Sequence, residues 1–171
     1  MTLDELNQLP FEHARAEFLK CCGSTAWAQR MSAARPFSNS AELSSKADEI
    51  WWNLNEEDWL EAFRAHPKIG EKKAAAAQSA EAEAWSAQEQ SESERAATKT
   101  KAALAEGNRE YEQRFGFIFI ICATGRSAEE ILAALNGRLS NDPETELRVA
   151  AEEQRKITSL RLGKLLQVSA A

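Results

Sequence analysis

The sequence predicts a predominantly helical protein with a single core. Glycine and proline are scarce, with seven and four in 171 residues, so few positions interrupt a helix. Apolar residues recur every three or four positions over most of the chain, which is the period of a helix that packs on one face. The length and the 43% content of hydrophobic residues suit one sizeable core, so two full domains are not expected.

The first half of the chain contains four predicted helices. Their apolar stripes lie within residues 11–22, 27–31, 43–54 and 59–63. Ser24 is placed to cap the second helix, and Asn55 begins the fourth. The second helix ends near Pro36, because the residue before a proline is pushed out of the helical region. For the same reason the fourth helix cannot continue regularly through Pro67.

The second half contains stronger and weaker signals. Residues 71–106 are rich in Ala, Glu, Gln and Ser and are expected to form two exposed helices, with Gly107-Asn108 interrupting the chain afterwards. The apolar run 115–122 has the composition of a strand, but a lone strand has no partner, so an extended buried segment and a helix stay equally open. Ser127 followed by Glu130 is a capping box, and a long last helix begins near Pro143.

The composition argues against several classes of partner. The formal charge of −6 and the pI near 5.1 provide no diffuse basic field for a phosphate backbone, so no nucleic acid is expected. The longest apolar run, 117–123, is far shorter than the roughly 20 residues of a membrane span, and the N-terminus lacks a basic, apolar leader. Three cysteines suit a reducing compartment, and the C-terminus lacks a peroxisomal address, so we expect a cytoplasmic protein without membrane association.

Metal and nucleotide sites are not expected either. His13 and His66 are the two histidines, they are far apart in sequence, and the adjacent Cys21 and Cys22 are a poor chelate on a helix. No glycine-rich loop of phosphate-binding type occurs. The three cysteines stand among apolar neighbours, which favours buried structural thiols over a nucleophile.

His66 is the best candidate for a general acid or base, because an imidazole exchanges protons near neutrality. At the C-terminal end of a helix, however, a histidine can equally bind the last carbonyl groups. From the residues alone, Glu89 looks like a solvated surface carboxylate and Arg161 like a snorkelling or salt-bridged side chain.

Ordered blocks over nearly the whole chain resemble the 2-oxo-4-hydroxy-4-carboxy-5-ureidoimidazoline (OHCU) decarboxylase family. The main blocks are 63–70 (FRAHPKIG), 86–90 (SAQEQ), 108–111 (NREY) and 115–117 (FGF). Further blocks are 22–24 with Trp27, 35–37, 58–60, 127–139 and 152–162. A His-Pro pair alone carries no information, but four ordered blocks at compatible spacing are specific.

This resemblance implies an all-α fold, a compact single-domain helical bundle over residues 1–171 that usually forms a homodimer. It implies a carboxy-lyase that converts OHCU to (S)-allantoin, the last step of urate degradation in purine metabolism. The implied ligand is a small ureide, and no cofactor and no metal are implied.

The resemblance also assigns roles to individual residues. It makes His66 the catalytic acid/base and places Glu89 in the same pocket as its catalytic partner. Our own hypothesis is that Glu89 fixes the ureido nitrogens and supports the proton relay. The implied substrate-binding residues are Pro67, Ser86, Ala87, Gln88, Glu89, Gln90, Phe119, Ile120, Ile121, Cys122 and Arg161. Ser86, Glu89 and Gln90 have the spacing of one helix face. Residues 119–122 supply an apolar wall, and the planar fork of Arg161 suits a carboxylate or a ring carbonyl.

Two other functions stay open. In a helical interaction module, the pair Trp51-Trp52 binds a partner helix and His66 merely caps a helix. In a hydrolase acting on a related ureide, Glu89 positions a water molecule and the product keeps its carboxyl group. Convergence of polar side chains on one small cavity distinguishes an enzyme from a binding module.

Overall fold

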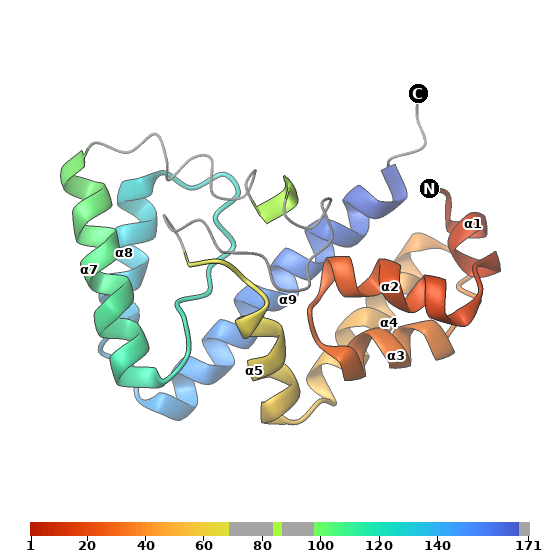
Figure 1. Ribbon diagram of the computed structural model, residues 1–171, viewed down its shortest axis with the longest axis horizontal. Coiled ribbons are helices and arrows are strands. Elements are labelled where there is room, and N and C mark those ends of the chain that lie inside the picture. Colours follow the sequence, from red (N-terminus) through yellow and green to blue (C-terminus); the bar gives the residue numbers. More distant parts are fainter. Residues whose placement is uncertain (69–83, 87–97, 168–171) are drawn as a thin grey trace. The chain divides into compact units, whose positions relative to one another are not determined.

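The structure is a computed structural model that describes residues 1–68, 84–86 and 98–167. In these residues the regular secondary structure is helical and includes no strand, which confirms the all-α prediction (Figure 1). The chain forms two compact units, Met1–Ala62 with Arg155–Ala171 and Phe63–Gln154. The single-domain organisation stays a prediction, and each unit is described on its own.

The first unit is built from the predicted helices of the first half. Its helices are α1 (Leu3–Gln8), α2 (Phe11–Cys21), α3 (Thr25–Ala33), α4 (Ser40–Trp52), most of α5 (Glu56–Arg64) and the C-terminal half of α9 (Pro143–Gln167). The Ser24 side chain caps α3, and the Asn55 side chain accepts a hydrogen bond from the Asp58 amide at 3.0 Å, so both predicted helix starts are confirmed. The short α1 was not predicted, although Thr2 and Glu5 form a capping box.

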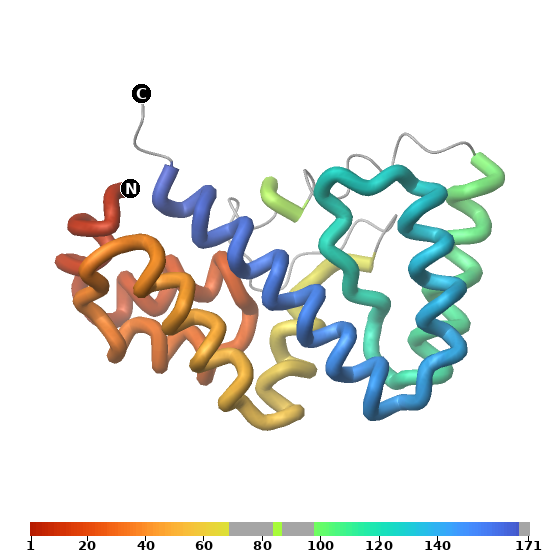
Figure 2. Tube along the Cα trace, turned by 180° about the vertical axis from the view of Figure 1, so that it is seen from behind, coloured from red at the N-terminus to blue at the C-terminus, as the bar shows by residue number. Residues whose placement is uncertain are grey.

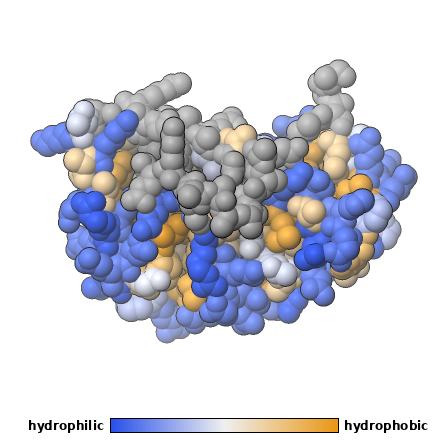
Figure 3. All heavy atoms as spheres, in the orientation of Figure 1, coloured by the Kyte–Doolittle hydropathy of each residue, from blue (hydrophilic) through white to orange (hydrophobic). Residues whose placement is uncertain are grey.

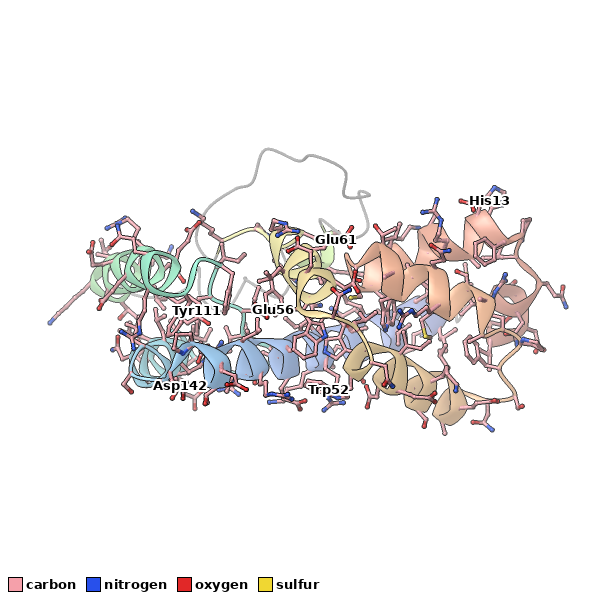
Figure 4. All side chains as sticks on the ribbon, turned by 90° about the horizontal axis from the view of Figure 1, so that it is seen from below. His13, Trp52, Glu56, Glu61, Tyr111 and Asp142 are labelled. Atoms are coloured by element: carbon pink, nitrogen blue, oxygen red, sulfur yellow. The ribbon has the colours of Figure 1, made fainter. Side chains whose placement is uncertain are left out.

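The core of the first unit is organised around tryptophans. Trp27 is fully buried and donates from Nε1 to the carbonyl of Ala47 at 3.1 Å. Trp51 is also buried, and its carbonyl accepts from Nε1 of Trp59 at 3.0 Å. Trp52, labelled at the end of α4 in Figure 4, is 39% exposed. The Trp51-Trp52 pair is therefore split between core and surface. Hydrophilic residues cover much of the described surface in the view of Figure 3, as expected for helices with one apolar face turned inward.

The second unit contains α7 (Thr98–Phe115) beside α8 (Ala128–Arg138), together with the N-terminal half of α9 (Figures 1 and 2). Its core consists of Leu104, Tyr111, Phe119, Ile121, Ala123, Ala128, Ile131 and Leu135. The predicted capping box at the start of α8 is present, with the Glu130 amide donating to Ser127 Oγ at 3.1 Å. The last helix begins at Pro143, as predicted.

The predicted interruption at Gly107-Asn108 is wrong, because α7 runs through both residues. Of the region 71–106, expected to form two helices, residues 69–83 and 87–97 lie outside the described part, and 98–106 belong to α7. A Cβ atom on Gly107 would lie 2.6 Å from Cδ2 of Leu135, which is fully buried on α8. The glycine therefore serves close helix packing and does not end the helix.

Gly107→Ala should have effects of opposite sign in two backgrounds. In the wild type the added methyl group overpacks the contact with Leu135, which is fully buried and has little room to move. The cost should lie in the upper part of the usual range of about 1–3 kcal/mol and so outweigh the gain of about 1 kcal/mol in helix propensity. In a Leu135→Ala background the space is open, so Gly107→Ala should stabilise by about 1 kcal/mol. Urea denaturation of the four variants measures this cycle. Equal stabilisation in both backgrounds would show that Gly107 is not needed for packing.

The apolar run after α7 is not helical, so the extended alternative is the better description and the helical one is wrong. The helix ends at Phe115, and Gly116 has a φ of 78°, which glycine adopts at little cost. The chain then runs without a helix to Ser127 (Figure 2). Two of its backbone groups form hydrogen bonds with side chains, as they would with a neighbouring strand in a sheet. Arg138 Nη1 donates to the Ile120 carbonyl at 2.7 Å, and the Cys122 amide donates to Glu153 Oε2 at 2.8 Å.

Candidate active site

His66 lies just beyond the end of α5, as the sequence predicts. The helix ends at Arg64, and the His66 amide donates to the Phe63 carbonyl at 3.1 Å in a closing turn. Pro67 follows and disfavours helical geometry at His66. The His66 side chain is only 8% exposed. The imidazole is therefore buried just beyond the end of the helix, where the low local dielectric strengthens its hydrogen bonds.

Contacts on both sides of His66 fix this turn within the second unit. The ring of the buried Phe63 packs against Phe117 at a centroid distance of 5.4 Å. Lys68 Nζ pairs with Glu112 Oε2 on α7 at 2.6 Å. The first contact ties the end of α5 to the segment after α7, and the second ties the residues after His66 to α7 itself.

The imidazole of His66 has a partner that the sequence did not reveal. His66 Nε2 lies 2.6 Å from Oε1 of Gln154, which is fully buried on α9. An amide oxygen can only accept a hydrogen bond, so Nε2 carries the proton in this arrangement. The neutral ring then has its lone pair on Nδ1. In the sequence Gln154 stands between Glu152-Glu153 and Arg155-Lys156, so no local signal marks it as buried or as a partner of His66.

Residues 119–122 form a buried wall in the same unit. Phe119, Ile120 and Ile121 are buried, and Cys122 is half-buried. The hydrogen bonds from Arg138 and to Glu153 hold the backbone of this wall. The guanidinium of Arg138 also lies 4.5 Å from the centroid of the Phe119 ring, a cation–π contact.

A fully buried carboxylate, Glu146 on α9, anchors the wall indirectly. Its Oε1 accepts from Arg138 Nε at 2.7 Å and from the Tyr111 hydroxyl, and its Oε2 accepts from Asn141 Nδ2 at 2.9 Å. Burial, and then the hydrogen bond to Glu146, raise the pKa of Tyr111 far above its usual range, so the hydroxyl stays protonated and donates. Tyr111 is labelled in Figure 4, and Glu146 itself is 0% exposed. Arg138 therefore reaches the wall from a fixed position.

Comparison with known proteins identifies the family of this chain. A family model described as OHCU decarboxylase matches residues 7–163. The chain belongs to the OHCU decarboxylase family.

The described helices include none with the length and apolar character of a membrane span. Among the same residues, no three or more His, Cys, Asp or Glu side chains are grouped so that they could hold a metal ion.

Curated relatives in this family are of two lengths. The uric acid degradation bifunctional protein TTL of Arabidopsis thaliana is 41% identical over 92% of this chain, and PucL of Bacillus subtilis is 30% identical over 96%. The chain spans only 48% and 33% of these two bifunctional proteins. The 2-oxo-4-hydroxy-4-carboxy-5-ureidoimidazoline decarboxylase of Amia calva is 31% identical over 99% of this chain and 97% of its own length.

Solved structures show the same relationship. A crystal structure of OHCU decarboxylase in the presence of (S)-allantoin has a TM-score of 0.76 and 41% identity, covering 88% of this chain and 97% of that one. A structure of (S)-allantoin synthase has a TM-score of 0.72 at 20% identity and covers 97% of this chain and 54% of that one; it shows a likeness of fold alone.

The residues that the OHCU decarboxylase resemblance assigns are placed as follows. In the second unit, Pro67 is half-buried, and Ser86 is buried in the helical turn 84–86. Ala87, Gln88, Glu89 and Gln90 lie outside the described residues. Arg161 belongs to the first unit, where it is 2% exposed and its charge acts on Cys21 and Cys22. The catalytic and binding roles of all these residues stay predictions.

The three thiols should differ sharply in reactivity. Cys21 and Cys22 are fully buried, and burial raises the pKa of Cys22 to about 11 and that of Cys21 further, against the opposing effect of Arg161. Both thiols should therefore stay protonated at pH 8 and resist alkylation, while the half-buried Cys122 should react first. Mass spectrometry after iodoacetamide treatment identifies the labelled residue. A Cys122→Ser variant should be alkylated only after it is unfolded. Alkylation of Cys22 in the folded protein would contradict the expectation.

Proposed function

We propose that this chain catalyses the decarboxylation of OHCU to (S)-allantoin in urate degradation. The observation that carries the proposal is a buried histidine at the predicted position, His66, held through Nε2 by Gln154 in a member of the OHCU decarboxylase family. A buried imidazole with one protonated nitrogen engaged can use the other for proton exchange.

The substrate chemistry explains why such a site is useful. The ureide carries a hydroxyl group and a carboxylate on one ring carbon, beside an unsaturated ring system. When the bond from this carbon to the carboxylate breaks, carbon dioxide leaves and the electron pair moves into the ring system. The hydroxyl-bearing carbon becomes a carbonyl carbon as the hydroxyl proton leaves, and a proton is added to the neighbouring carbon, which carries the ureido group and is the stereocentre of allantoin. In the proposed reaction His66 supplies or relays this proton, and delivery from one face sets the handedness of the allantoin.

The apolar wall favours this step electrostatically. The carboxylate charge is localised in the substrate and spreads into the ring in the transition state. Phe119, Ile120 and Ile121 are buried. In the proposed site they solvate the localised charge less well than water does, so they favour the state with dispersed charge. In the proposed site Arg161 binds a carboxylate or ring carbonyl, and Ser86, Glu89 and Gln90 bind polar groups of the ureide, with Glu89 supporting the proton relay.

The proposal extends to the state of the protein in the cell. A homodimer is proposed from the family resemblance, and light scattering of the purified protein tests it. The cytoplasm is proposed because Cys21, Cys22 and Cys122 are all free thiols, which suits a reducing compartment.

The first experiment generates the unstable ureide in situ and adds the purified chain, while carbon dioxide release and optical activity are followed together. Fast, enantioselective formation of (S)-allantoin supports the proposal. The proposal would be contradicted if carbon dioxide were released at the same rate as without the protein and the product were racemic. A product that keeps its carboxyl group would favour the hydrolase. The interaction module loses part of its basis, because Trp51 is buried against Trp59.

A further inference from the structure

We propose that Gln154 is a positioning residue that fixes the tautomer of His66, so that Nδ1 exchanges the proton with the substrate. The proposal deepens the proposed function and rests on it for the role of Nδ1 in the reaction. The assignment of the tautomer itself rests on the contact between the two side chains.

The geometry of the contact supports a fixed donor and acceptor. The distance of 2.6 Å between His66 Nε2 and Gln154 Oε1 is short, and the two side chains are 8% and 0% exposed. In the Nε2–H tautomer this is a hydrogen bond. In the Nδ1–H tautomer, with the Gln154 amide in this orientation, two lone pairs would face each other at that distance. Leaving buried acceptors facing each other is unfavourable enough to bias the tautomers by about fivefold or more.

The same turn of α9 also holds the apolar wall. Glu153 precedes Gln154 directly, and its Oε2 accepts from the Cys122 amide at 2.8 Å. Two consecutive residues of one rigid helix therefore fix the histidine and the backbone of residues 119–122. A helix is a more accurate support for such a pair than a loop is.

A neutral partner suits the proton exchange better than a carboxylate. A glutamate at position 154 would stabilise the imidazolium and raise the pKa of His66, so that the ring would hold its proton more tightly. Several charged groups in the described part of this unit are paired with other groups: Lys68 binds Glu112, Arg138 binds Glu146, and Glu153 binds the Cys122 amide. Gln154 thus orients the ring without adding a charge.

The chain suits a direct test by NMR because it has only two histidines. Nitrogen-15 spectra of the imidazole rings distinguish Nε2–H from Nδ1–H, and the exposed His13 on α2 serves as the internal reference (Figure 4). The test variants are Gln154→Met, which keeps the volume but removes the acceptor, and Gln154→Glu, which keeps an acceptor. Ile157→Val, a buried change one turn along α9, controls for loss of packing.

The wild type should show His66 with the proton on Nε2 when neutral. Gln154→Met should give a mixture of tautomers and lower kcat by up to about 100-fold with little change in KM, since ring orientation is lost while substrate contacts remain. Gln154→Glu should keep the Nε2–H form and move the His66 titration up by about one pH unit or more. Ile157→Val should leave the His66 spectrum and kcat unchanged.

Three results would overturn the proposal. The first is a neutral wild-type His66 with its proton on Nδ1. The second is a wild-type His66 spectrum in Gln154→Met, and the third is equal loss of kcat in Gln154→Met and Ile157→Val. Absence of decarboxylase activity in the wild type is a separate result. It would reject the proposed function, while the spectra would still decide whether Gln154 fixes the tautomer.

Discussion

Replacing His66 by Asn is expected to lower the rate of (S)-allantoin formation by about 10²- to 10⁴-fold, the usual contribution of a general acid or base. Asparagine can still donate a hydrogen bond from its amide in this buried turn, but it cannot supply or take up a proton near neutrality. The fold should persist, because the turn is also fixed by Phe63 against Phe117 and by Lys68 with Glu112. Steady-state rates and thermal unfolding of the same preparation measure the two effects separately.

The second histidine provides the matched control. His13 is exposed on α2, in the first unit, and His13→Asn makes the same chemical change there. Its rate and optical selectivity should equal those of the wild type. Turnover near the wild-type rate in His66→Asn would remove His66 from the mechanism, whatever the stability of the variant.

Local signals predicted most of the fold. Ser24, Ser127 and Pro143 act through residues within one helical turn, so the helix starts that they predict are confirmed. The predicted interruption at Gly107 was wrong because, in the sequence, a glycine that permits close helix packing looks the same as one that ends a helix. What distinguishes the two is the position of Leu135 on α8, which no short stretch of sequence contains.

The site divides in the same way. The position of His66 at a helix end follows from the adjacent Pro67, so it could be predicted. Its contact with Gln154 could not be predicted, because the two residues are 88 positions apart in the sequence. Arg138 and Glu146 are also charged residues that a sequence places on the surface, yet both are buried, because each satisfies the other.

Removing the carboxylate of Glu146 is expected to destabilise the protein by about 3–5 kcal/mol, because it leaves the charge of Arg138 buried without its partner. Tyr111 and Asn141 also lose an acceptor. Urea denaturation of Glu146→Ala measures this loss. The control is Glu12→Ala, which breaks an exposed ion pair with Arg15 and should cost no more than about 1 kcal/mol. Equal costs at the two sites would show that the buried pair is not coupled to folding.

A double variant separates the structural role of this pair from its role at the site. Arg138→Met with Glu146→Met replaces both charges by apolar groups and should recover much of the stability lost in Glu146→Ala. It still removes the donor to the Ile120 carbonyl and the cation on Phe119, so residues 119–122 lose an anchor. We therefore expect a folded protein whose rate of allantoin formation stays below that of the wild type. A double variant with full activity would show that Glu153 and packing alone hold the wall in place.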